Sequence, residues 1–309
     1  MKLAFDARPA EEPRGIGRYA TCLLAALQQT RGEHEIVETG RPRRVDVFHS
    51  PWIDGALLRP AVPQVVTLHD VVPLKRRSEY LRTGIRFRLR YLAVQRSTRV
   101  IVPTAVVAAE AVEHLGLDPA RIVVVPEAPA PALTPRAADE VDAARVRYGL
   151  PDEYLLWVGG LQTPDPRKRI AALARTPREL PLVLVGATKP WAHELPDVTL
   201  TGHVSDDALA AIYSGARALV FPSDDEGFGL PTIEALACGT PVVASDLPVL
   251  REVLGDRATF VAAEDLEGLL AAGAAAKRPA PAPPAWWWTD AARATWDVYT
   301  DALAHSSSS

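Results

Sequence analysis

Cysteine is almost absent from this sequence of 309 residues, in which Cys22 and Cys238 are the only two. Two cysteines cannot build a disulfide framework, and they leave no cysteine cluster for a structural zinc site. No apolar run approaches the roughly 20 residues that a membrane-spanning helix needs. The first residues also lack the apolar core of a signal peptide. We therefore expect a chain that stays in the reducing cytoplasm.

An excess of charge of one sign is missing as well. The 34 Lys and Arg residues face 38 Asp and Glu residues, which gives a formal net charge of −4 and no general basis for nucleic-acid binding. No spaced D-x-D metal motif occurs, because Asp224 and Asp225 are adjacent, so we expect neither a metal nor another cofactor. The length and the 48% hydrophobic content suit a globular protein of two domains.

The most informative stretch is residues 221–246, FPSDDEGFGLPTIEALACGTPVVASD. It follows an apolar segment that predicts a strand, and it passes through a loop with two glycines into a short helix predicted over residues 232–237. A second strand is predicted over residues 241–244. A strand, a glycine loop and a helix N-terminus in this order direct backbone N–H groups and a positive dipole end at an anion.

Two carboxylates lie close to this predicted anion site. Glu226 is in the loop, and Glu234 is in the first turns of the helix, where we expect it to face outward rather than to pack. A carboxylate beside a phosphate site accepts paired hydrogen bonds from neighbouring hydroxyls, as in a sugar or a ribose. The alternative is that both residues only cap and solvate the helix N-terminus.

The motif E-G-F-G-L-P-x-x-E-A-L-A-C-G-T-P-V-V-A-S resembles the donor-site signature of the GT-B retaining glycosyltransferases of family 4. The resemblance implies that Glu226 contacts hydroxyls of the donor sugar and that Glu234 contacts the ribose of the nucleotide. It also implies that backbone N–H groups of the loop lie against the sugar and the diphosphate. These groups belong to Gly227, Phe228, Gly229 and Leu230.

A second glycine-containing segment, GIGRY, precedes a helix predicted over residues 18–28. GIGRYA formally matches the dinucleotide-binding pattern, but that pattern needs its first glycine at the end of the strand, and about nine residues separate the two here. The segment instead resembles the glycine loop of the family's N-terminal domain. The resemblance implies that Gly15 and Gly17 face the donor phosphates across a cleft.

Two further predicted strands, residues 45–49 and 64–70, carry His49 and His69 at or near their ends. Functional groups gather at the carboxyl ends of parallel strands, so each histidine is either a cleft residue or a hydrogen-bonded structural residue. The segment VVTLHDVVP resembles the family's T-x-H-D-x-x-P motif. The resemblance implies that His69 lines the active site near the transferred sugar, where it positions groups and supports charge.

A basic segment lies between Lys75 and Arg99, with nine Lys or Arg residues and one acidic residue. Apolar residues recur in it at helical spacing: Leu81, Ile85, Leu89 and Leu92. This pattern predicts one basic amphipathic helix whose apolar face packs on the core. A second interpretation is peripheral docking of this helix on an anionic lipid surface or an anionic acceptor.

The second half of the chain opens with a predicted strand that ends in a glycine turn, followed by the cations Arg167 and Lys168. Cations beside the Glu226 loop would neutralise a leaving diphosphate, and a solvated charge run is the alternative. The segment resembles the family's VG-x-x-x-x-x-RK motif, which implies the diphosphate role for both residues.

The resemblance has departures. Leu161 and Gln162 stand where relatives often carry an arginine after the glycine turn, and Arg169 replaces the usual asparagine after the lysine. Further on, GHVSD matches the family's G-x-V-S-D turn, which implies that the backbone at Val204 lies near the nucleotide base. Ser205 is also a suitable N-cap for the helix predicted to follow.

Strands alternate with helices along the chain, which predicts parallel sheets and the α/β class. The resemblance implies the GT-B architecture, with two Rossmann-like domains that face a central cleft. We expect an N-terminal acceptor domain over residues 1–135 and a donor domain over residues 136–285. A C-terminal helix within residues 286–309 is expected to return to the first domain.

We interpret the chain as a retaining glycosyltransferase that moves a hexosyl unit from a nucleotide sugar by a metal-independent front-face mechanism. GIGRY together with T-x-H-D-x-x-P most resembles the mannosyl- and rhamnosyl-transferring branch, so GDP-mannose is the first expectation for the donor. The acceptor class stays open among a sugar, a lipid-linked sugar and a natural product. The alternatives are a non-catalytic nucleotide-sugar-binding subunit and an epimerase or phosphorylase on the same scaffold.

Overall fold

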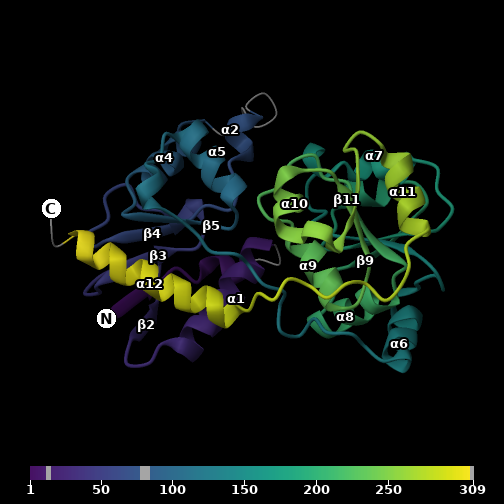
Figure 1. Cartoon of the computed structure of the whole chain (residues 1–309), viewed down its shortest axis with the longest axis horizontal. Helices are drawn as coiled ribbons and strands as arrows, with labels where there is room; N and C mark the ends of the chain where they lie inside the picture. Colours follow the sequence, from purple (N-terminus) through teal and green to yellow (C-terminus); the bar gives the residue numbers. More distant parts are fainter. Residues whose placement is uncertain (12–14, 77–83, 307–309) are drawn as a thin grey trace. The chain divides into compact units, whose positions relative to one another are not determined.

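The computed structural model describes residues 1–11, 15–76 and 84–306. The chain separates into two units, each with its own sheet and hydrophobic core (Figure 1). Unit 1 comprises Met1–Ala128 and Trp286–Ser309, and unit 2 comprises Pro129–Ala285. The final helix therefore belongs to unit 1, although unit 2 precedes it in the sequence.

Unit 1 is built on a parallel sheet in the order β2-β1-β3-β4-β5-β6. The strands are β1 (Lys2–Phe5), β2 (Glu35–Glu38), β3 (Val47–Ser50), β4 (Gln64–Thr67), β5 (Arg99–Val102) and β6 (Ile122–Val124). The strand order reverses between β1 and β3, which are direct neighbours. In open α/β sheets, ligands bind outside the carboxyl ends of the strands at such a switch point.

Helices cover both faces of this sheet. They are α1 (Gly15–Thr30), α2 (Val72–Lys75), α4 (Gly84–Gln95), α5 (Ala105–Leu115) and α12 (Trp288–Ser306). Helices α1 and α12 lie side by side and share one core cluster with β1 and β3 (Figure 1). Helices α4 and α5 contribute to a separate cluster with β4 and β5. This two-sided covering explains why every residue of β3, β4 and β5 is buried.

Helix α1 begins at Gly15, so both glycines of GIGRY lie within its first turn. The expectation of a glycine loop followed by a helix from residue 18 is therefore wrong. Tyr19, Leu23 and Leu27 recur every four residues and are all buried, which fixes one face of the helix on the sheet. Packing along this whole face stabilises the first turn despite its two glycines.

The single basic helix expected between Lys75 and Arg99 is also wrong. Lys75 ends α2, the helix that can be described is α4, and Arg99 begins strand β5. Residues 77–83, including Leu81, lie outside the described residues. Leu89 was expected to pack on the core but is 40% exposed, because Tyr91 and Val94 form the buried face. Docking on an anionic lipid surface stays a prediction for α4.

Unit 2 has a second parallel sheet in the order β12-β11-β10-β7-β8-β9. Its strands are β7 (Leu155–Val158), β8 (Leu182–Val185), β9 (Val198–Gly202), β10 (Ala218–Phe221), β11 (Val242–Ser245) and β12 (Thr259–Val261). Its helices are α6 (Ala138–Tyr148), α7 (Ile170–Arg175), α8 (Asp206–Gly215), α9 (Leu230–Ala237), α10 (Pro248–Leu254) and α11 (Leu266–Ala274). Here the order reverses between the neighbours β7 and β10.

Local signals in the sequence account for several helix boundaries in unit 2. The hydroxyl of Ser205 accepts a hydrogen bond from the backbone N–H of Ala208, which confirms Ser205 as the N-cap of α8. Proline occupies the first turn of both α9 and α10, where a missing N–H costs nothing. Gly149 ends α6 in the left-handed conformation.

The two parallel sheets with helices between the strands confirm the α/β class and the pair of Rossmann-like units. Within the part of the chain that the structure describes, no helix combines the length and the apolar character needed to cross a membrane.

Candidate functional site

The predicted donor-binding residues of unit 2 gather at the carboxyl ends of β7 and β10, the two strands that flank the switch point. The loop after β7 carries Arg167 and Lys168, and the loop after β10 carries Glu226. A backbone hydrogen bond of 2.9 Å from the N–H of Asp224 to the carbonyl of Arg167 joins the two loops. This bond fixes side by side two loops that are far apart in the sequence.

Glu226 is half-buried, and its position is set by Ser223. The Ser223 hydroxyl is fully buried and donates a hydrogen bond of 2.8 Å to one carboxylate oxygen of Glu226. This bond directs the side chain within the loop that leads to the N-terminus of α9. A carboxylate can accept several hydrogen bonds, so the one from Ser223 does not by itself saturate Glu226.

Glu234 lies in α9 and is only 2% exposed, so the expectation that it faces outward is wrong. Every residue of α9 from Thr232 to Leu236 is buried, because both sides of this short helix are covered. The Tyr213 hydroxyl lies 3.4 Å from Glu234 Oε2 and donates to it. A buried carboxylate needs such donors, since burial of an unpaired charge is costly.

Gly229 shapes the entrance to α9. Its φ of +84° lies in the left-handed region, and it occupies the N-cap position. A Cβ at this residue would lie 2.7 Å from Cδ2 of Leu250, which is a buried side chain. Both the backbone conformation and the close approach of Leu250 therefore require glycine. The neighbouring Gly227, Phe228 and Leu230 are buried in the same turn.

The two predicted diphosphate cations differ in their surroundings. The Arg167 Nε donates to Asp165 Oδ2 at 3.0 Å, which ties the guanidinium to its own turn. The Lys168 ammonium lies 5.8 Å from the ring centroid of Trp157, a cation–π distance. Lys168 also lines a pocket, and Arg167 does not.

That pocket has a volume of about 370 Å³ and lies wholly within unit 2. The loop after β7 forms most of its wall, with Trp191 and Asp224 on other sides. Its lining is mainly apolar, and its charged members are the cations Lys168 and Arg169 and the carboxylates Asp165 and Asp224. A concave apolar surface with a few placed charges is the usual form of a small-molecule site.

Arg169, which stands where the resembled family usually has asparagine, adopts the left-handed conformation with φ of 54° as the N-cap of α7. Asparagine tolerates this conformation better than arginine, which gives the family preference a backbone reason. Val204, the predicted contact to the base, is buried in the turn after β9, at the same edge of the sheet.

In unit 1, His69 lies at the carboxyl end of β4 and is 16% exposed. Its Nε2 lies 2.9 Å from the backbone carbonyl of Pro51, and its Nδ1 lies 3.2 Å from a carboxylate oxygen of Glu127. A carbonyl oxygen can only accept, so Nε2 carries a proton. The ring of Tyr19 packs edge-on against the imidazole at 4.6 Å, which ties the GIGRY segment to His69.

The pair with Glu127 changes the charge of His69. Burial alone would lower the pKa of His69, but the hydrogen bond and the negative charge of Glu127 raise it. The Pro51 carbonyl and the charge of Asp70 act in the same direction, so the net pKa is raised. An imidazole that donates from both nitrogens cannot accept the proton of an acceptor hydroxyl. His69 is therefore suited to support negative charge and not to act as a general base.

We expect Glu127→Gln to lower the pKa of His69, because the amide removes the negative charge that favours the imidazolium. A histidine with a raised pKa stabilises the folded state fully below its unfolded pKa of about 6.5, and this stabilisation is lost as the pH rises through the folded pKa. The variant should therefore lose more stability at about pH 5 than at about pH 8. Histidine proton NMR measures the pKa, with the exposed Glu113→Gln as control. An unchanged pKa of His69 in Glu127→Gln contradicts this description.

His49 lies in the core of unit 1 and is fully buried. Its Nδ1 is 2.6 Å from the Tyr299 hydroxyl, and its Nε2 is 2.9 Å from the Thr67 hydroxyl. Burial lowers its pKa to about 3, so the ring is neutral. The Thr67 hydroxyl also lies 3.0 Å from that of Tyr19. These hydrogen bonds join α12 to α1 through His49. Of the two interpretations of His49, a cleft residue or a structural residue, they favour the structural one.

Two family models match the chain. The model of "Glycosyl transferases group 1" matches residues 152–276, and that of "Glycosyltransferase Family 4" matches residues 13–128. The first lies in unit 2 and contains the Lys168 and Glu226 loops, and the second lies in unit 1 and contains GIGRY and His69.

Known proteins agree with these matches. A D-inositol 3-phosphate glycosyltransferase of Mycobacterium avium is 31% identical over 92% of this chain and 73% of its own length. The serotype-specific mannosyltransferase WbdA of Escherichia coli is 30% identical over 62% of this chain, which spans only 26% of WbdA. Among solved structures, Anabaena HepE in complex with UDP and glucose superimposes with a TM-score of 0.69 at 16% identity, covering 100% of this chain and 95% of that one.

The two Rossmann-like units and their structural neighbours define the GT-B glycosyltransferase fold. Within that class, the chain belongs to glycosyltransferase family 4.

Proposed function

We propose that this protein is a retaining glycosyltransferase that uses a nucleotide-sugar donor held by unit 2. The observation that carries the proposal is the junction of the Lys168 and Glu226 loops at the β7/β10 switch point. It combines cations, backbone N–H groups at the start of α9 and an oriented carboxylate within one edge of one sheet. These are the groups that a diphosphate and sugar hydroxyls require.

In the proposed reaction, the bond between the anomeric carbon and the leaving phosphate oxygen breaks while the acceptor oxygen forms a bond on the same face. The proton of the acceptor hydroxyl passes to the departing phosphate. Lys168 and Arg167 stabilise the negative charge that develops on the diphosphate. Glu226 orients the sugar through its hydroxyls, and Glu234 contacts the ribose. The backbone of residues 227–230 lies along the sugar and the diphosphate, and Val204 lies near the base.

Unit 1 is proposed to supply the acceptor side, with His69 near the transferred sugar and Gly15 and Gly17 directed at the donor phosphates. His69 suits an electrostatic role, because both of its nitrogens face acceptor oxygens and its pKa is raised. GDP-mannose is the proposed donor on the strength of the mannosyltransferase relative, although HepE binds UDP. The acceptor is a sugar, a lipid-linked sugar or a natural product, and the transfer needs no metal.

The test is a thermal-shift and hydrolysis screen against nucleoside diphosphates and their sugars, with EDTA present throughout. A ligand at 100 times its Kd stabilises the folded state by about 2.7 kcal/mol, which a thermal shift detects readily. We expect GDP to stabilise the protein and GDP-mannose to be hydrolysed slowly without metal. Stabilisation without any turnover would favour a binding subunit, and no stabilisation by any nucleotide would exclude the donor site.

A further inference from the structure

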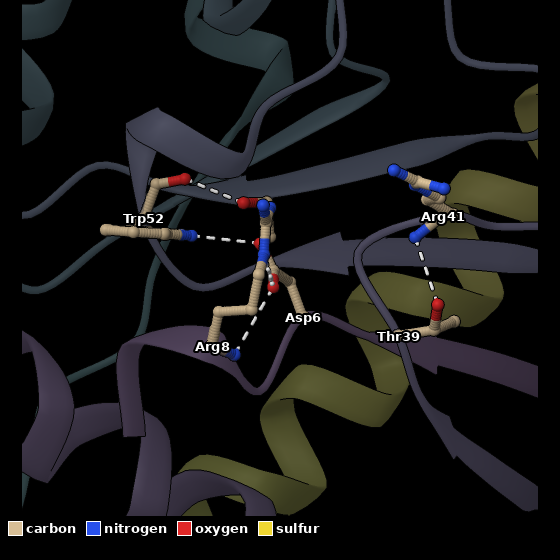
Figure 2. A network of polar contacts seen from close by, with 6 residues as sticks. Asp6, Arg8, Thr39, Arg41 and Trp52 are labelled. Atoms are coloured by element: carbon tan, nitrogen blue, oxygen red, sulfur yellow. Dashed lines mark hydrogen bonds and ion pairs between the residues drawn. The ribbon is translucent and has the colours of Figure 1, made fainter. Parts of the chain in front are cut away.

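A second group of polar side chains, joined by hydrogen bonds, lies in unit 1 at the carboxyl ends of β1 and β3 (Figure 2). Asp6 follows β1 directly and is fully buried, and Arg8 is two residues further on. The guanidinium of Arg8 donates from Nε and Nη2 to the two carboxylate oxygens of Asp6, each at 2.7 Å. The indole N–H of Trp52, just after β3, donates to Asp6 at 2.9 Å. The carboxylate is thus held from two strands.

The surroundings fix Arg8 in one orientation. A Cβ on Gly40 would lie 2.9 Å from the guanidinium carbon of Arg8, so the backbone after β2 packs directly on this group. The same carbon lies 5.9 Å from the centroid of the Trp52 ring. A Cβ on Gly55 would lie 2.1 Å from Asp6 Oδ2. Glycine at both positions allows the backbone to close around the ion pair.

The ion pair is buried at one end and open at the other. The Asp6 side chain is inaccessible to solvent, whereas the Arg8 side chain is 57% exposed. Burial alone would raise the pKa of Asp6, but the hydrogen bonds from Arg8 and Trp52 and the charge of Arg8 lower it, so the carboxylate stays ionised. Nε and Nη2 of Arg8 face Asp6, which leaves the Nη1 donors for another group.

The position in the fold indicates a ligand. Strands β1 and β3 flank the switch point of unit 1, where open α/β sheets bind their ligands. The turn after β2 packs on Arg8 and carries three more exposed arginines, Arg41, Arg43 and Arg44. Figure 2 shows the start of this turn, with the backbone N–H of Arg41 bonded to Thr39. Exposed acidic residues lie nearby as well: Glu11 follows Arg8 along the chain, and Glu38 and Asp46 flank the turn.

We propose that Arg8 binds a phosphoryl group of the acceptor, in a subsite that Asp6, Trp52 and Gly40 hold in place. This proposal rests on the acceptor role of unit 1. Arginine matches the geometry of phosphate, and a guanidinium fixed in advance loses little conformational entropy when it binds. The chemistry fits equally a soluble phosphate ester and the headgroup of a phosphate-bearing lipid.

The first experiment titrates the full chain with inorganic phosphate while saturating GDP occupies unit 2, with equal ionic strength kept by NaCl. The indole N–H resonance of Trp52 in a proton–nitrogen NMR spectrum is the readout, because this group donates to Asp6 beside Arg8 and is present in every variant. We expect a saturable shift of this resonance, and an affinity at least about tenfold weaker in Arg8→Lys, because a lysine ammonium cannot form the paired bonds. Arg31→Gln, an exposed arginine after the far end of α1, is the matched control and should bind as the wild type does.

A second arm distinguishes the two sources of phosphate. Sedimentation with vesicles of phosphatidylcholine alone or with added phosphatidylinositol shows whether binding that depends on Arg8 needs a lipid surface. Binding in either arm supports the proposal if Arg8→Lys weakens it. Equal binding by the wild type and Arg8→Lys in both arms, or no binding in either, overturns it.

Two further controls separate this proposal from the others. Arg8→Lys keeps a cation for Asp6, and the double variant Asp6→Asn with Arg8→Gln removes both charges. Neither variant therefore leaves a buried carboxylate unpaired, so both should fold and weaker phosphate binding reports on the guanidinium. GDP binding should be unchanged in both variants. If GDP fails to bind the wild type, the donor proposal fails, while the phosphate titration without GDP still tests Arg8.

Discussion

Glu226→Gln is expected to lower kcat for sugar transfer by about 100-fold or more, with nucleoside diphosphate affinity nearly unchanged. Removal of one oriented group that supports the transition state typically costs this much. The amide oxygen can still accept the hydrogen bond from Ser223, so the loop should keep its fold. What is lost is the charged acceptor for the sugar hydroxyls, because charge-assisted hydrogen bonds are about twice as strong as neutral ones.

The matched control is Asp225→Asn, which makes the same chemical change on the adjacent residue. Asp225 has no proposed contact with the donor, and neither it nor Glu226 lines the pocket of unit 2. Initial rates with the donor identified by the screen, together with thermal shifts by the nucleoside diphosphate, separate turnover from binding. Full turnover in Glu226→Gln would remove the proposed role of this carboxylate.

Gly229→Ala is expected to lower the free energy of unfolding by about 3 kcal/mol. The left-handed conformation costs an L-residue about 1–2 kcal/mol, and overpacking against a buried side chain adds about 1–3 kcal/mol. Here the side chain is that of Leu250, and the φ of Gly229 is +84°. The donor site should weaken as well, because this residue caps α9.

Gly149→Ala separates the two contributions to this cost. Gly149 is in unit 2 and has a φ of +62°, but a Cβ there would meet nothing within 4 Å. Its substitution should therefore cost only the backbone strain, about 1 kcal/mol. Urea unfolding of both variants gives the comparison. Equal losses would mean that Leu250 moves aside without cost and that only the conformation requires glycine.

Most of the fold could be predicted from the sequence, because the signals that mark strands and helices are local. Strand β4 begins at Gln64 and helix α9 ends at Ala237, as predicted, since turn residues bound their apolar runs. Strand β2 was not predicted. It is an edge strand with no fully buried residue, so it lacks the apolar run that marks the others.

Residues of the candidate site could be predicted only where they belong to one contiguous sequence motif. The Glu226 loop and the Lys168 segment were found in this way, but Glu127 was not, because its partner His69 lies 58 residues away in sequence. Its position just after β6, at the carboxyl edge of a parallel sheet, was the available signal. The burial of Glu234 was missed for a similar reason, since the helical pattern does not show what covers α9.

The network around Arg8 shows the same limit. Asp6, Gly40, Trp52 and Gly55 come from segments that follow three different strands, and no spacing in the sequence connects them. Only the register of β2, β1 and β3 brings their carboxyl ends together.

The most direct test of the central claim is the anomeric configuration of the first sugar released from the nucleotide-sugar donor. Proton NMR records it in the presence of EDTA, before the free sugar mutarotates. A retaining transferase acting on GDP-mannose with an α-linkage should release α-mannose first, and Glu226→Gln should slow this release by about 100-fold. Initial release of the β-anomer, or no release from any donor that stabilises the protein, would contradict the account.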